Sequence, residues 1–174
     1  MSRAFTKEDD SLEAPIIPSR AALPPGTPNY VTPVGLEQLR QELTELEAAR
    51  SAAEANRENE ADRTRLLTLL NGQLSQLQAR LNTARLVDPR SQPAQEVRFG
   101  ATVVLRPVGS KGPTRQFTIV GVDEASVAEG KVAFVAPIAR AVQGAKLGQR
   151  LTLHLGAKPE EVEVGSITYD PGTS

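Results

Sequence analysis

The sequence contains no cysteine and no tryptophan, one histidine and few aromatic residues. Disulfides, zinc ribbons, iron–sulfur clusters and thiol nucleophiles all need cysteine, so these sites are excluded. A histidine cluster for a metal ion, or a histidine relay, cannot be built from His154 alone. Because aromatic residues make up 3% of the chain, an aromatic-lined ligand pocket or a base-stacking platform is not expected. The composition therefore excludes most of the chemistry that a protein performs alone.

An excess of charge of one sign and long apolar runs are also missing. The 20 lysine and arginine residues are balanced by 21 aspartate and glutamate residues, giving a net charge of -1. This balance argues against a globally basic nucleic-acid binder, although it leaves room for a local basic patch. No apolar run approaches the roughly 20 residues that span a bilayer, and the N-terminus has no apolar signal core. We expect a soluble cytoplasmic protein without membrane contacts.

The chain divides into three parts that differ in composition. The first part, residues 1–31, contains five prolines. Proline fixes φ and lacks an amide donor, so this density disfavours a regular element. We predict a Pro-rich, irregular and mostly extended N-terminal tail. It is either a disordered leader or a segment that packs on the protein or a partner through Ile16-Ile17 or Tyr30-Val31.

The second part, residues 32–88, carries the clearest periodic signal. Leucines recur at spacings of three and four in two series, Leu36–Leu46 and Leu67–Leu81. This heptad pattern is typical of helices that pack along a seam. Thr32-Pro33 is a good helix start, and Asp88-Pro89 ends the pattern because the residue before proline avoids the α region.

A polar stretch, Arg50–Arg65, separates the two leucine series and has no large apolar residue. Asn56 and Asn59 tolerate the left-handed backbone of a turn, and a turn there would place the two series face to face. We therefore predict an antiparallel coiled-coil hairpin with an acidic tip near residues 54–62. A long dimeric coiled coil is the alternative.

In residues 89–174 glycine, proline and β-branched residues become frequent, and alternation replaces the heptad. A short helix is predicted at Pro137–Gly144, with proline at its start and glycine at its stop. His154 falls on the polar face of a strand, as a surface histidine does. The strands are predicted at residues 101–106, 115–121, 131–135, 150–155 and 161–169. The fold class is then α+β, a helical hairpin followed by a small antiparallel β domain with one short helix.

The predicted hairpin tip carries four carboxylates, on Glu54, Glu58, Glu60 and Asp62. Glu54 and Glu58 are four residues apart, so they share a face if the first helix reaches that far. Exposed carboxylate pairs hold Mg²⁺ weakly, because magnesium prefers oxygen ligands and keeps several waters. No stable metal site is expected in the isolated protein. The alternative interpretation is that the charged end of the hairpin is simply solvated.

Three segments of the last part resemble motifs of the Gre family of bacterial transcript-cleavage factors, so the chain looks GreA/GreB-like. They are Arg98-Phe-Gly-Ala-Thr-Val103, Ile119-Val-Gly-Val-Asp-Glu-Ala125 and Ala136-Pro-Ile-Ala-Arg-Ala141. These match the family's FGA-T-V entry strand, its IVG-x-DEA turn and its SP-[IM]-ARA helix start, and the resemblance covers roughly residues 32–170. It implies that residues 89–174 form an FKBP-like domain that docks at the rim of the secondary channel of bacterial RNA polymerase. The hairpin then reaches toward the polymerase active site.

The same resemblance implies a bacterial transcription elongation factor that stimulates polymerase to cleave backtracked RNA. Tip carboxylates would position Mg²⁺ and the attacking water in the polymerase active site, which performs two-metal hydrolysis. The factor is then not an enzyme: it has no cofactor of its own, shares Mg²⁺ with the polymerase, meets the nascent RNA 3′ end only indirectly and acts as a monomer. Glu58 matches the family's tip glutamate, and Glu54, Glu60 and Asp62 are the candidates for a second carboxylate.

The sequence departs from the family pattern at the tip. Ala55 stands where the family has an aspartate. The first arm, residues 32–58, is also about two to three helical turns shorter than expected, roughly 10–16 Å at 1.5 Å per residue. Both departures favour an alternative function, a secondary-channel regulator of RNA polymerase that does not promote cleavage.

The predicted polymerase-docking residues match the family more closely. Without the resemblance, Asp123 and Glu124 would be interpreted as a solvated β-turn, and residues 137–140 as a helix cap over the core. The predicted partner-binding residues are Asp123 and Glu124 in the acidic turn, and Pro137, Ile138, Ala139 and Arg140 at the helix start.

FKBP-like topology also suggests a remote alternative, a peptidyl-prolyl isomerase. Isomerases of that fold need an aromatic-lined pocket, and fold does not imply function. The aromatic residues available in this domain are Phe99, Phe117, Phe134 and Tyr169.

Overall fold

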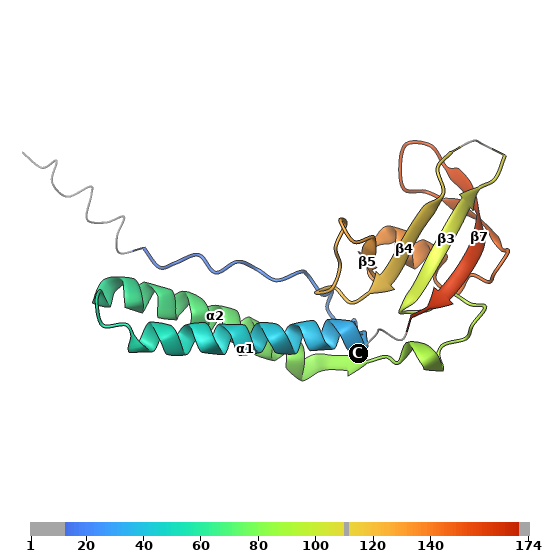
Figure 1. Cartoon of the computed structure of the whole chain (residues 1–174). Coiled ribbons are helices and arrows are strands. Elements are labelled where there is room, and N and C mark those ends of the chain that lie inside the picture. Colours follow the sequence, from blue (N-terminus) through green and yellow to red (C-terminus); the bar gives the residue numbers. More distant parts are fainter. Residues whose placement is uncertain (1–12, 110–111, 171–174) are drawn as a thin grey trace, which may run out of the picture. The chain divides into compact units, whose positions relative to one another are not determined.

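The computed structural model describes residues 13–109 and 112–170 (Figure 1). Residues 1–12 of the predicted tail therefore lie outside the described residues. Contacts group the described chain into two compact units, residues 13–20 with 40–80 and residues 21–39 with 81–170. No helix within these residues is long and apolar enough to cross a membrane.

Two long helices form the hairpin, α1 (Pro33–Ala55) and α2 (Glu60–Thr83). Because α1 ends at Ala55 and the chain turns back before α2, the antiparallel hairpin is confirmed (Figure 1). The alternative, a long dimeric coiled coil, needs one continuous helix and is wrong. Leu70, Leu74 and Leu77 are buried. Their spacing of four and three is the apolar seam that the heptad pattern predicts.

A parallel ribbon of two short strands, β1 (Asn29–Val31) and β2 (Ala84–Leu86), is absent from the sequence-based prediction. It corrects two expectations, because the tail is not irregular throughout and the helix ends at Thr83 instead of near Asp88. Val31 is 3% exposed, and the Asn29 side-chain amide donates a hydrogen bond to the Thr83 hydroxyl at 3.3 Å. β1 follows the proline-rich segment and β2 continues the helical leucine pattern, so neither shows the alternation of a strand. Within β1, Asn29 and Val31 are buried.

The C-terminal part contains all five predicted strands and the predicted short helix, α3 (Pro137–Val142). A 3₁₀ turn at Pro89–Ser91 precedes them. The strands, in the sheet order β5-β4-β3-β7-β6, are β5 (Lys131–Ala133), β4 (Arg115–Val120), β3 (Ala101–Pro107), β7 (Glu160–Tyr169) and β6 (Arg150–Leu153).

Three of the four strand pairings are antiparallel, as predicted. The fourth, between β4 and β5, is parallel, with Thr118 opposite Lys131 and Val120 opposite Ala133. The reason is the connection at residues 121–130, which carries the chain back along β4 before β5 begins. The prediction of a purely antiparallel sheet is therefore wrong at this edge.

The core lies between α3 and one face of the sheet. Alternate residues of β3, namely Ala101, Val103 and Leu105, are fully buried, and the helix adds Ala139 and Val142. This alternation is the period of two that predicted the strand. On the other face, the Thr102 and Thr118 hydroxyls form a cross-strand hydrogen bond of 2.8 Å. His154 is exposed, as predicted.

An aromatic cluster fastens the segment before α1 to the sheet. The Tyr30 ring centroid lies 5.7 Å from that of Phe99 and 5.6 Å from that of Phe134. The two phenylalanine rings meet edge to face with centroids 5.5 Å apart, an arrangement that aromatic pairs prefer. At the end of β4, a Cβ atom on Gly121 would lie 2.6 Å from the backbone oxygen of Tyr30. Glycine is therefore required there by the approach of two backbones.

We predict that Gly121→Ala lowers the free energy of unfolding by about 1–3 kcal/mol, because the added methyl group forces a backbone shift. Urea unfolding followed by circular dichroism measures the change. Gly156→Ala is the control, since a Cβ atom there meets nothing within 4 Å. Equal stability of the two variants would contradict the assigned role of Gly121.

The hydroxyl of Tyr169, at the end of β7, joins the two residues that flank Val97. It donates a hydrogen bond to the backbone oxygen of Glu96 and accepts one from the backbone N–H of Arg98 at 3.0 Å. Burial raises the pKa of Tyr169 above its ordinary value of 10.0. The folded state therefore favours the neutral phenol.

It follows that the stabilising effect of Tyr169 is fully present below its unfolded pKa and is lost as the pH rises through its folded pKa. We expect Tyr169→Phe to be less stable than the wild type by about 1 kcal/mol at pH 8. This difference should shrink above a pH of about 10. Urea unfolding of both proteins from pH 8 to pH 11 checks it, and a difference independent of pH would show that ionisation of the phenol does not contribute.

Candidate functional site

The hairpin tip is ordered by two asparagine side chains. The Asn56 side-chain oxygen accepts a hydrogen bond from the backbone N–H of Glu58 at 3.0 Å, and that of Asn59 accepts one from the backbone N–H of Asp62 at 3.1 Å. The second bond caps the start of α2. The expectation that Asn56 and Asn59 adopt a left-handed backbone in this turn is wrong, because no described residue other than glycine has a positive φ. The asparagines act instead through their side-chain amides.

The four predicted tip carboxylates are all exposed, and they come from three different elements. Glu54 lies in the last turn of α1, Glu58 in the connecting loop, and Glu60 and Asp62 in the first turn of α2. Because α1 ends at Ala55, the first helix does not reach Glu58, and the condition for Glu54 and Glu58 to share a helix face is not met. Acidic residues in the first turn of α2 are favoured by the helix dipole.

Glu60 has a cationic neighbour, since an Arg63 guanidinium nitrogen lies 4.0 Å from its carboxylate. Exposed pairs of this kind contribute only about 0–1 kcal/mol. In the part of the chain that the structure describes, no group of three or more acidic or histidine side chains gathers into a metal site.

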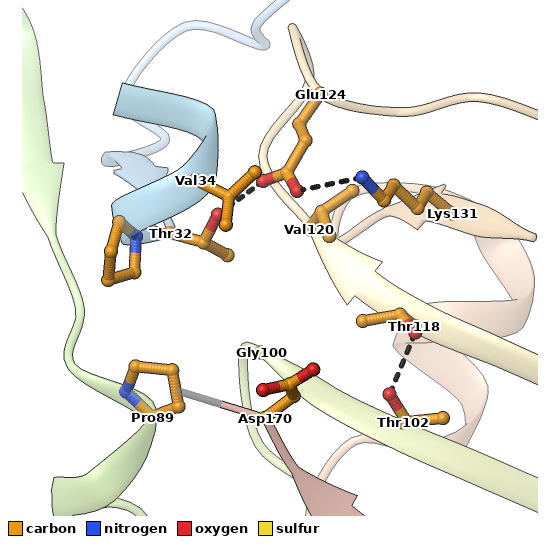
Figure 2. Close-up of a pocket in the computed structure, with 11 residues that line it drawn as sticks. Thr32, Val34, Pro89, Gly100, Thr102, Thr118, Val120, Glu124, Lys131 and Asp170 are labelled. Atoms are coloured by element: carbon orange, nitrogen blue, oxygen red, sulfur yellow. Dashed lines mark hydrogen bonds and ion pairs between the residues drawn. The ribbon is translucent and has the colours of Figure 1, made fainter. Parts of the chain in front are cut away.

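A second polar site lies beside the start of α1, within the unit of residues 21–39 and 81–170. A cleft of about 180 Å³ is lined there by Thr32, Glu124 and Lys131 (Figure 2). The Thr32 hydroxyl donates a hydrogen bond to the Glu124 carboxylate and accepts one from the backbone N–H of Gly35 at 2.9 Å. The other carboxylate oxygen of Glu124 lies 3.5 Å from the Lys131 ammonium group. We call these three residues the Thr32–Glu124–Lys131 clasp.

The clasp changes the interpretation of Glu124, which was predicted to bind a partner. Glu124 is 8% exposed, and a carboxylate so buried needs hydrogen-bonding or charged partners, which Thr32 and Lys131 supply. A turn is present, since the Glu124 N–H donates to the Gly121 oxygen at 3.2 Å, but the side chain is not solvated. The sequence gives no signal for this contact, because Thr32 is 92 residues away.

The other predicted docking residues differ in how far they are exposed. Pro137 and Arg140 are exposed, Ile138 and Asp123 are half-buried, and Ala139 belongs to the core. On α3, then, a partner has direct access to Pro137 and Arg140. Their role in docking stays a prediction.

The aromatic cluster of Tyr30, Phe99 and Phe134 borders a cavity of only about 40 Å³. Ligand pockets usually measure about 300–1,000 Å³. Tyr30 from the N-terminal segment packs against Phe99 and Phe134 in this cluster. The structure therefore gives no support to the isomerase alternative.

Removing the buried carboxylate tests the clasp. We expect Glu124→Ala to lower the free energy of unfolding by about 1–3 kcal/mol, because it leaves the Thr32 hydroxyl without its acceptor and removes the buried partner of Lys131. Glu129→Ala is the matched control, because Glu129 lies 3.5 Å from the same Lys131 ammonium group but is exposed. Its removal should cost under about 1 kcal/mol. Chemical denaturation measures both, and an equal loss would show that burial does not distinguish the two carboxylates.

The comparisons with known proteins agree with the motifs. The family described as "Transcription elongation factor, GreA/GreB, C-term" matches residues 92–169. The transcription elongation factor GreA of Thermodesulfovibrio yellowstonii is 30% identical over 154 residues, which are 80% of this chain and 96% of that protein. GreB of Neisseria meningitidis is 31% identical over 157 residues, 82% of this chain and 95% of that protein.

A solved structure of a GreA/GreB factor from Nitrosomonas europaea covers 80% of this chain and 98% of its own, with 22% identity and a TM-score of 0.40. The hairpin of two long helices and the five-stranded sheet together define an α+β protein. The sequence relatives make the assignment specific: the chain belongs to the GreA/GreB family of transcription elongation factors. The resemblance found in the sequence is confirmed.

Proposed function

We propose that this elongation factor binds RNA polymerase, inserts its hairpin into the secondary channel and stimulates the polymerase to cleave backtracked RNA. The observation that carries the proposal is the tip, where Glu58 is exposed in a loop ordered by Asn56. Family membership supports RNA polymerase as the partner. On this proposal the chain is not itself an enzyme, because the metal ions and the RNA belong to the polymerase site.

The tip residues have separate tasks in this mechanism. The hydrogen bond from the Glu58 backbone to the Asn56 side chain limits the conformations of the loop, so the carboxylate is presented at low entropic cost. The carboxylate can then accept a proton or a hydrogen bond from the attacking water. Asn59 fixes the start of α2 through Asp62. Mg²⁺ held in the polymerase would supply the charge stabilisation of two-metal hydrolysis.

One observation favours a second candidate function, occupation of the channel without cleavage. Ala55, the last residue of α1, stands where the family has an aspartate, so the tip offers no carboxylate at that position. Glu54, Glu60 and Asp62 replace it only if one of them meets Glu58 in the complex. A factor that lacks the second carboxylate would still compete for the channel and would alter elongation.

Cleavage by a stalled, backtracked polymerase separates the two functions. We expect the wild-type protein to accelerate release of short 3′ RNA, and Glu58→Gln to reduce that acceleration about tenfold or more while leaving binding unchanged. A tenfold loss corresponds to about 1.4 kcal/mol of transition-state stabilisation. Glu47→Gln is the control, since Glu47 is exposed on α1 and its substitution removes the same charge away from the tip.

The outcomes are distinct. Binding without accelerated cleavage by the wild-type protein would support the second function. Loss of cleavage in Glu47→Gln as well would point to overall charge instead of the tip. Absence of polymerase binding would contradict both functions. Asp62→Asn in the same assay shows whether Asp62 supplies the second carboxylate.

A further inference from the structure

The N-terminal segment at residues 13–20, which we call the strap, lies in the same compact unit as residues 40–80 of the hairpin. Its Ile17 side chain occupies the space next to Gly72, the only glycine in α2. A Cβ atom on Gly72 would lie 2.1 Å from the Ile17 Cδ1 atom. Glycine in the middle of a helix is normally unfavourable, and this close approach gives a physical reason for it.

A second anchor joins the strap to the other helix. The Arg20 guanidinium group donates two parallel hydrogen bonds to the Glu42 carboxylate on α1, at 2.7 and 3.0 Å. The Arg20 side chain is only 18% exposed. Bidentate pairs of this type fix orientation as well as contact. Ile17 and Arg20 therefore place the strap in a defined register across both helices.

The docking of the strap on the hairpin can also be reversed. The strap forms no helix or strand with the hairpin, so it adds no regular backbone ladder. Ile16, beside the docked Ile17, is 91% exposed, so only part of the strap is in contact. The pair between Arg20 and Glu42 is partly exposed and is weakened by salt. Against these contacts stands the conformational entropy of eight ordered residues.

We propose that the strap is a releasable cover of the hairpin, and that its docking competes with entry of the hairpin into RNA polymerase. This inference rests on the proposed function, in which the hairpin is the part that the polymerase surrounds. A strap held on both helices adds a third segment of polypeptide to the hairpin beside Gly72 and Glu42. Binding of the strap and of the polymerase are then coupled, and each weakens the other.

The absence of cysteine from the chain allows a direct test. In Ile17→Cys/Gly72→Cys, the two new thiols are the only ones present. The Ile17 Cγ1 and Cγ2 atoms lie 2.9 and 3.3 Å from a Cβ atom on Gly72, so the Ile17 Cβ atom that carries them falls within the roughly 3.5–4.5 Å of disulfide geometry. Oxidation locks the strap on the hairpin, and reduction releases it in the same protein.

The measurement is the affinity for purified RNA polymerase, with the oxidant removed before mixing. We expect the oxidised double variant to bind about tenfold or more weakly than its reduced form, while the wild-type protein is unchanged by the same treatment. Apparent affinity falls with the fraction of protein that is competent to bind, and the disulfide reduces that fraction toward zero. If the disulfide does not form, the docking of Ile17 beside Gly72 is wrong, and the proposal fails with it.

A release variant tests the opposite direction in the full chain. Ile17→Asp removes the docked side chain and should bind polymerase more tightly, about threefold if the strap is docked two-thirds of the time. Ile16→Asp is the matched control, with the same change on the exposed neighbour, and should bind like the wild type.

The failures are distinguishable. If the wild type binds polymerase and all forms bind equally, the cover is wrong and the proposed function stands. If the oxidised form binds more tightly than the reduced form, the strap is part of the interface and the cover is again wrong. If the wild type does not bind polymerase, the proposed function fails and the cover fails with it.

Discussion

One hydroxyl group, that of Thr32, carries the connection on which the rest of the sheet-bearing unit depends. It caps the first turn of α1 through the Gly35 amide and at the same time satisfies the buried Glu124 carboxylate. A buried carboxylate without partners would be costly, so Glu124 and Lys131 hold Thr32 in place as much as Thr32 holds them. The start of the helix and the turn after β4 are therefore specified together. Either one alone would leave a polar group unsatisfied.

Three glycines in this chain are needed for space and not for unusual backbone angles. Gly35 faces Glu124, Gly121 faces the Tyr30 backbone, and Gly72 faces Ile17; none of them has a positive φ. The first two lie within the sheet-bearing unit and bring the segment before α1 close to the turn. Gly72 lies in the hairpin unit and admits the strap. Gly121 and Gly72 thus make room for segments that precede α1 and lie far from these glycines in the sequence.

What could be predicted from the sequence follows from the range of each interaction. Leu70, Leu74 and Leu77 reveal their helix because the repeat is local, and β3 reveals itself by alternation in the same way. The parallel edge at β5 depends on the path of a loop, and β1 comes directly after the proline-rich segment, so neither is marked by a local pattern. The burial of Glu124 depends on a residue 92 positions away. The tip asparagines are an intermediate case, because the turn that they predict is present but is held by their side-chain amides and not by left-handed backbone.

The tip and the strap place different demands on the same hairpin. The tip is ordered by hydrogen bonds between neighbours in sequence, such as that from Glu58 to Asn56, so its form does not depend on what else touches the helices. It offers exposed carboxylates, and within the described residues no group of three or more acidic or histidine side chains gathers into a metal site. In the proposed function, the metal ions and the RNA that meet Glu58 belong to the polymerase. Regulation by the strap would therefore act on entry of the helices that Ile17 and Arg20 contact, and not on the tip itself.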